Sequence, residues 1–171
     1  MGEEMISDGK AYFIKKTFQK GEQLMSVKKE YLSPCGMYCS VCAVRSADLY
    51  NDQKLKEILA AVFGTSPENV VCDGCMSENT FQFAKTCSIR ACAEEKSLEG
   101  CYQCDEFPCN HINSFPFEIS RNMMLEAIPR WKELGTERWV TEVEDHYTCS
   151  NCGALLHRFA SQCPNCQAPK N

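Results

Sequence analysis

Residues 35–42 read CGMYCSVC, and three more cysteine motifs follow: CDGC at 72–75, CSIRACAEEK at 87–96 and CYQCDEFPC at 101–109. Three pairs within this block have the spacing Cys-x-x-Cys. That spacing lets two thiolates from one tight turn bind the same metal ion. The sequence therefore predicts a mainly α, small cysteine-rich domain that is stabilised by metals.

All fourteen cysteines of the 171-residue chain are candidate metal ligands. They are Cys35, Cys39, Cys42, Cys72, Cys75, Cys87, Cys92, Cys101, Cys104, Cys109, Cys149, Cys152, Cys163 and Cys166. The first ten suffice for two four-thiolate sites with two cysteines left over. The pairs 39/42, 72/75 and 101/104 are the preferred ligands, but spacing does not decide which pairs combine.

The metal of the first ten cysteines is open between zinc and a [4Fe–4S] cluster, because both accept four thiolates. The dense runs C-x2-C-x4-C and C-x3-C-x2-C suit a cluster, whereas zinc sites usually show simple pairs. On these patterns we favour zinc. His111 follows Cys109 by two residues and is a further candidate ligand, although we expect a surface or supporting imidazole.

The last cysteines form the separate pattern C-x2-C-x10-C-x2-C from Cys149 to Cys166. It resembles a zinc ribbon, in which two β-hairpins clamp one tetrahedral Zn²⁺ through four thiolates. Gly153 follows the second cysteine as the tight turn requires, while Gln167 replaces the usual glycine after the fourth. Four thiolates leave no open metal position, so we expect a structural zinc.

Helical periodicity is clearest from Asn51 to Gly64, where Leu55, Ile58, Leu59, Val62 and Phe63 fall on one face. Asn51 or Asp52 can cap its start, and Gly64 can end it. Residues 87–96 and 120–135 also read as helical, and Pro129 should kink the latter or start a second helix. We expect Thr136 to cap a final helix over 137–144.

The charge of −5 argues against broad attraction to nucleic acid or anionic membranes. Met1 to Lys10 lacks the apolar core of a secretory signal, and no apolar run reaches the length of a membrane span. We therefore expect a cytoplasmic protein with reduced cysteines rather than disulfides. A protein partner is possible, and oligomeric state is not encoded in any visible pattern.

The CGMYCSVC spacing matches the cluster loop of radical S-adenosylmethionine enzymes, but the alternating strands and helices of those enzymes do not follow. The four motifs together resemble an uncharacterised family of cysteine-rich domains with the pattern CGxYCxxC, CxGC, CxIRxCAxEK and CxxCxxFPC. A Gly-x-x-x-Trp step at Gly135 to Trp139 completes the resemblance. The resemblance implies a domain that binds zinc or iron–sulfur, and it implies no activity.

We therefore divide the chain into an N-terminal extension (1–30), a main domain (31–145) and a zinc ribbon (146–171). The preferred function is zinc binding with a structural, interaction or adaptor role. An iron–sulfur protein for electron transfer or redox sensing is the alternative. An enzyme is the second alternative, with Arg90 near Cys87 and Cys92 as its local candidate. We expect a binding protein, because the sequence shows no catalytic triad, phosphate loop or dinucleotide motif.

Overall fold

The computed structural model describes residues 27–170, so most of the predicted N-terminal extension lies outside it. The described part is mainly helical, as predicted, and contains no strand. Its elements are η1 (Lys29–Tyr31), η2 (Cys39–Val41), α1 (Ala43–Leu49), α2 (Gln53–Phe63), η3 (Pro67–Asn69), α3 (Gln82–Lys85), α4 (Ser88–Glu95), η4 (Cys101–Gln103), α5 (Asn110–Asn113), α6 (Glu118–Leu134) and α7 (Thr136–Tyr147). No described helix is long and apolar enough to cross a bilayer.

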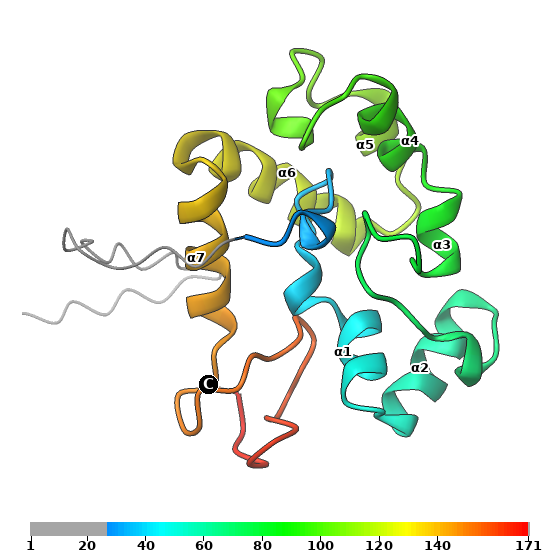
Figure 1. Cartoon of the computed structure of the whole chain (residues 1–171), viewed down its shortest axis with the longest axis vertical. Helices are drawn as coiled ribbons and strands as arrows, with labels where there is room; N and C mark the ends of the chain where they lie inside the picture. Colours follow the sequence, from blue (N-terminus) through cyan, green and yellow to red (C-terminus); the bar gives the residue numbers. More distant parts are fainter. Residues whose placement is uncertain (1–26, 171) are drawn as a thin grey trace, which may run out of the picture.

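The two longest helices, α6 and α7, follow one another and meet at an angle beside the segment that carries the first cysteine motif (Figure 1). Trp131 and Trp139 stack between them, with ring centroids 4.4 Å apart and an interplanar angle of 10°. Both rings are fully buried, with Val41 of η2 in the same cluster. The stacked indoles therefore form the base on which the first motif rests.

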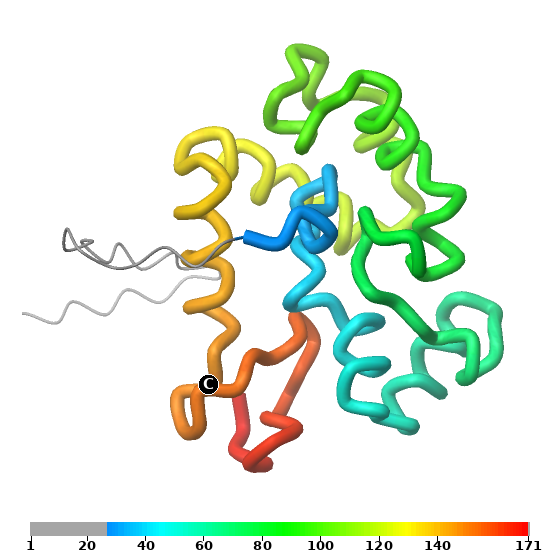
Figure 2. The backbone as a smooth tube through the Cα atoms, viewed as in Figure 1, coloured from blue at the N-terminus to red at the C-terminus, as the bar shows by residue number. Residues whose placement is uncertain are grey.

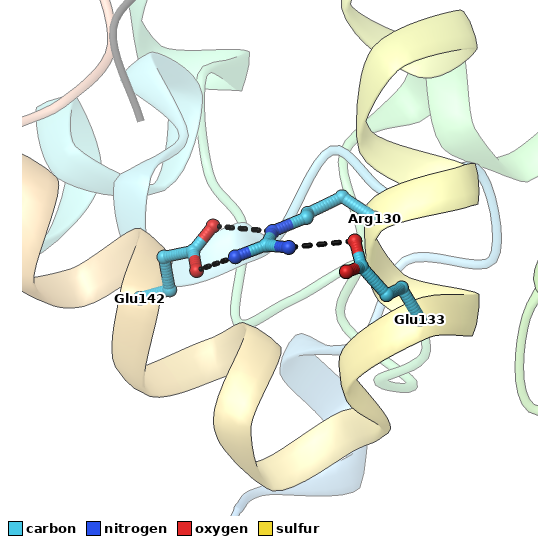
Figure 3. A network of polar contacts seen from close by, with 3 residues as sticks. All are labelled: Arg130, Glu133 and Glu142. Atoms are coloured by element: carbon cyan, nitrogen blue, oxygen red, sulfur yellow. Dashed lines mark hydrogen bonds and ion pairs between the residues drawn. The ribbon is translucent and has the colours of Figure 1, made fainter. Parts of the chain in front are cut away.

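An arginine also fastens α6 to α7 (Figure 3). The Arg130 guanidinium donates two hydrogen bonds to the Glu142 carboxylate, at 2.9 and 2.6 Å, and one to Glu133 at 2.6 Å. The two carboxylates raise the pKa of Arg130. Because the Glu142 contact is bidentate and joins two helices, it fixes their relative position as well as pairing charge.

Two details of this helix pair differ from the sequence prediction. Helix α6 runs on through Pro129, so the alternative of a second helix starting there is wrong. Thr136 is the first residue of α7 and makes no side-chain cap. Its hydroxyl accepts a hydrogen bond from Trp131 Nε1 at 3.0 Å and donates one to Glu99 at 2.6 Å. The prediction of a capping role was wrong because tertiary partners occupy the hydroxyl.

Helix α2 forms where it was predicted, between the Asp52 cap and Gly64. The Asp52 carboxylate accepts from the Leu55 amide at 3.0 Å, and Gly64 is left-handed with φ +64°. The predicted apolar face is divided, however. Leu55, Leu59 and Phe63 pack inward against α1, whereas the side chains of Ile58 and Val62 are more than half exposed.

The end of the chain folds into two short loops beside α7 and η2 (Figure 2). Each loop closes with one isolated antiparallel bridge, between Thr148 and Leu155 and between Gln162 and Pro169. The predicted β-hairpins are thus reduced to single bridges within residues 27–170. Arg158 N–H donates to the Val41 carbonyl at 3.0 Å and joins these loops to the first cysteine motif.

Candidate metal centres

The four C-terminal cysteines converge on one point. The sulfurs of Cys149, Cys152, Cys163 and Cys166 all lie within 4.8 Å of one another. Two pairs are closer, with Cys149 Sγ 3.8 Å from Cys166 Sγ and Cys152 Sγ 3.6 Å from Cys163 Sγ. A tetrahedral zinc with bonds of about 2.3 Å requires sulfurs roughly 3.8 Å apart. This ribbon site therefore fits a single tetrahedral ion.

Amide groups around the ribbon site favour thiolates. The Asn151 side chain donates to Cys166 Sγ at 3.3 Å, and together with the Ala168 amide it lowers the pKa of Cys166 to about 6. The Ala154 amide and the Asn165 side chain likewise lower the pKa of Cys152. Such donors hold the sulfurs in their metal-binding orientation, as outer contacts of metal ligands commonly do.

A second group of thiols joins the first two motifs, and we call Cys39, Cys42, Cys72 and Cys75 the knuckle group. Cys39 lies in η2, and Cys42 is the N-cap residue of α1. The Cys75 amide donates to Cys39 Sγ at 3.1 Å. Spacing alone did not decide which Cys-x-x-Cys turns combine, and in the structure these two turns face each other.

Burial raises the pKa of Cys39, and the neighbouring thiols Cys42, Cys75 and Cys72 raise it further. Burial also raises the pKa of Cys42, against amide donors from Arg45 and Val44 and the positive charge of Arg158. In the metal-free protein the Cys39 and Cys42 thiols therefore hold their protons at neutral pH. A metal that binds there must displace those protons.

The 72–75 turn is held by backbone and carboxylate contacts. Asp48 of α1 accepts from the Cys72 amide at 3.0 Å and from Lys56 Nζ at 2.9 Å. Gly74 has φ +139°, and a Cβ there would lie 2.4 Å from the Glu30 carbonyl oxygen. Only glycine fits this approach to η1.

The remaining motifs surround a small cavity. We call Cys92, Cys101, Cys104 and Cys109 the cavity group, because all four line it together with His111. Cys92 comes from α4, Cys101 from η4, Cys104 from the residue after η4, and Cys109 from the residue before α5. Burial raises the pKa of Cys101 to about 12, and neighbouring thiols contribute to the shift.

Cys35 and Cys87 do not line the cavity, although both pack in the apolar cluster beside it. Burial raises the pKa of Cys35 to about 11, with a smaller effect from Cys87. Cys87 precedes α4, whereas Cys92 lies inside it and lines the cavity, so the two cysteines of that motif do not belong to the same group. Arg90, the candidate basic partner, pairs with Glu94 at 2.9 Å.

The thiols of the main domain are more widely spaced than those of the ribbon. Within residues 27–170, only the ribbon cysteines form a group of three or more potential metal ligands whose ligand atoms all lie within 4.8 Å of one another. All fourteen cysteines are free thiols. The structure thus brings the predicted ligands into neighbouring groups, and only the ribbon group has the spacing of a single-ion site.

Sequence reasoning missed two cations beside these thiols. Arg158 of the ribbon reaches toward Cys42, and its buried Nε and one terminal nitrogen lack hydrogen-bond partners. Lys96 forms a 2.7 Å ion pair with Glu106 and also interacts with Cys104 and Cys92. Lys96 ends the 87–96 motif and Arg158 lies in the ribbon, but spacing does not place either cation beside a thiol, so only the fold reveals the contacts.

Comparison with known families matches the part of the chain that contains the first ten cysteines. A family model, DUF3795, described as a protein of unknown function, matches residues 31–114. The matched residues hold the ten cysteines of the main domain, which is consistent with an uncharacterised cysteine-rich family. The match ends before the Gly135 to Trp139 step that we expected to belong to it. Searches of curated proteins and of solved structures give no match.

Proposed function

We propose that this chain is a zinc-binding protein in which the ribbon site holds a structural Zn²⁺. The supporting observation is the set of four sulfurs within 4.8 Å, with pairs at 3.8 and 3.6 Å. Four thiolates saturate tetrahedral zinc and leave no position for a substrate or a nucleophilic water. The ion then fixes the two loops of a minimal zinc ribbon.

The role of this zinc is to attach the chain end to the main domain. Leu156 N–H donates to the Tyr147 carbonyl of α7 at 2.8 Å, and Arg158 N–H donates to Val41 of η2. Leu155 packs against the Trp131 and Trp139 cluster. Without the ion, the two loops would lose the four metal–sulfur bonds that hold them together.

We extend the zinc proposal to the knuckle group, which combines two Cys-x-x-Cys turns. The Cys75 amide contact to Cys39 and the fit of Gly74 support a preformed turn. A zinc with four thiolates carries a net charge of −2. The unpartnered nitrogens of Arg158 beside Cys42 would then face an anionic centre, which explains a buried guanidinium at this place.

An interaction or adaptor role has support from the surface between α2 and the ribbon. A groove of about 380 Å³ lies there, and Tyr50, Ile58 and Phe159 line it with largely exposed side chains. Rigid metal-bound loops on one wall would present these apolar groups to a protein partner. Because Phe159 is 58% exposed, F159S should leave metal content and stability unchanged while removing part of this surface.

The test of the zinc proposal is native mass spectrometry and elemental analysis of the reduced full chain. We expect zinc at the ribbon site in the wild type and one zinc fewer in C152S. The matched control C87S changes a cysteine outside both proposed zinc sites and should keep the full zinc content. Equal zinc content in C152S and the wild type would overturn the proposal.

A further inference from the structure

The ribbon contacts the knuckle group through one residue of its loop, where that loop meets the segment before α1 (Figure 2). Arg158 lies between the second and third ribbon cysteines, and its N–H donates to the Val41 carbonyl at 3.0 Å. Val41 is fully buried and stands between Cys39 and Cys42 in the chain. A metal in the ribbon site closes the loop that carries Arg158, because its ligands lie on both sides of that residue. The position of Arg158 against the knuckle group therefore depends on the ribbon.

Within residues 27–170, the side chain of Arg158 has no carboxylate partner. Its Nε and one terminal nitrogen are buried and find no hydrogen-bond acceptor in this part of the chain. Its guanidinium carbon lies 5.4 Å from the centre of the Tyr147 ring, a contact that leaves those donors unsatisfied. A buried cation is unfavourable unless an anionic group faces it. The guanidinium therefore requires negative charge nearby.

The neighbours of Arg158 identify the source of that negative charge. Burial raises the pKa of Cys42, and the charge of Arg158 opposes this rise, so the guanidinium favours a thiolate there. Burial lowers the pKa values of His146 and Lys170, and the charge of Arg158 lowers both further, so it repels these two groups as cations. A zinc ion with four thiolates carries a net charge of −2. The filled knuckle group is thus the neighbour that matches the guanidinium.

We propose that Arg158 couples the two zinc sites, so that filling the ribbon site tightens zinc binding by the knuckle group. The inference rests on the proposed zinc function of both groups. Ribbon zinc holds the guanidinium at the knuckle group, and the guanidinium stabilises the negative charge that the knuckle zinc and its thiolates carry. By reciprocity, zinc in the knuckle group tightens the ribbon site by the same factor. Arg158 lies outside residues 31–114, so the coupling joins the matched region to the part of the chain beyond it.

The experiment titrates the reduced full chain with chelator-buffered zinc and reads the alkylation of each cysteine by mass spectrometry. Protection of Cys72 reports the knuckle group, and protection of Cys149 reports the ribbon site. We expect R158M and C152S each to need about tenfold more free zinc than the wild type for half-protection of Cys72, a usual size for coupling between sites. R158M should still protect Cys149 at saturating zinc, which shows that the ribbon folds. Because both changes break one link, R158M/C152S should be no weaker than either single variant.

K170M is the matched control. Lys170 also lies in the ribbon, with its Nζ 4.3 Å from the centre of the Tyr147 ring, so K170M removes an equal charge and a similar contact without touching the link to Val41. K170M should protect Cys72 like the wild type, and R158K, which keeps the positive charge, should recover most of the affinity that R158M loses.

Three results would overturn the coupling: an equal loss in K170M, unchanged Cys72 protection in C152S, or additive losses in R158M/C152S. Each of them leaves the zinc sites themselves in place. If Cys72 is never protected in the wild type, the zinc assignment of the knuckle group is refuted, and the coupling with it.

Discussion

The 72–75 turn gives a prediction whose size follows from the structure. In G74A, the new Cβ would lie 2.4 Å from the Glu30 carbonyl oxygen, at a φ of +139°. Occupying such a conformation costs a residue with a side chain about 1–3 kcal/mol. Relieving the contact also weakens the Met76 hydrogen bond to Glu30, worth about 1 kcal/mol. We expect G74A to lose roughly 2–4 kcal/mol of unfolding free energy.

The matched control is G64A. Gly64 is also left-handed, at φ +64°, but nothing lies within 4 Å of its ideal Cβ. G64A should lose about 1 kcal/mol of unfolding free energy. Replacing glycine by alanine also reduces the entropy of the unfolded chain, and this effect is the same in both variants.

The assay is urea unfolding of the reduced, metal-loaded protein by circular dichroism, with zinc measured in parallel. At an m-value of about 2 kcal/mol/M, G74A should lower the midpoint by about 1–2 M. It should also lose zinc from the knuckle group and keep the ribbon zinc. If G74A unfolds no earlier than G64A and keeps all its zinc, the assignment of the turn to a metal site is refuted.

Two further predictions concern the helix pair and the ribbon. E142Q should lower the unfolding free energy in chemical denaturation by about 1–2 kcal/mol, because it weakens the bidentate contact to Arg130. E133Q, whose carboxylate is 67% exposed, should lower it by about 0.5 kcal/mol or less. Equal losses in the two variants would contradict the helix-joining role of Glu142. In the metal-free protein Cys166 is mainly thiolate above pH 6, so N151A should raise the midpoint of its pH-dependent alkylation, read by mass spectrometry; an unchanged midpoint would contradict the amide contact.

Local patterns in the sequence predicted the features that local contacts control. Asp52 and Gly64 bound α2 as expected because capping depends on neighbouring backbone groups. The ribbon cysteines converge because two short turns suffice to bring them together. Helical periodicity, in contrast, locates an apolar face without saying what covers it. Ile58 was therefore predicted to be buried and is 53% exposed.

The arrangement of the ten other cysteines depends on contacts between distant segments. Cys39 meets the 72–75 turn across 36 residues, and spacing alone favoured no such pairing over its alternatives. Arg158 approaches Cys42 only because the ribbon packs against η2. Ligand counting leaves two cysteines over, and spacing alone does not say which; in the structure Cys35 and Cys87 are the two that lie outside both the knuckle group and the cavity group.

The short elements between residues 31 and 114 explain why metal centres would be needed at these places. Helix α1 has seven residues, and α3 and α5 have four each, lengths that are not stable in isolation. The buried residues form separate small clusters instead of one continuous core. The knuckle group joins η2 and α1 to the 72–75 turn, and the cavity group joins α4 to the segment before α5. Metal centres there would therefore connect the clusters that apolar packing leaves apart.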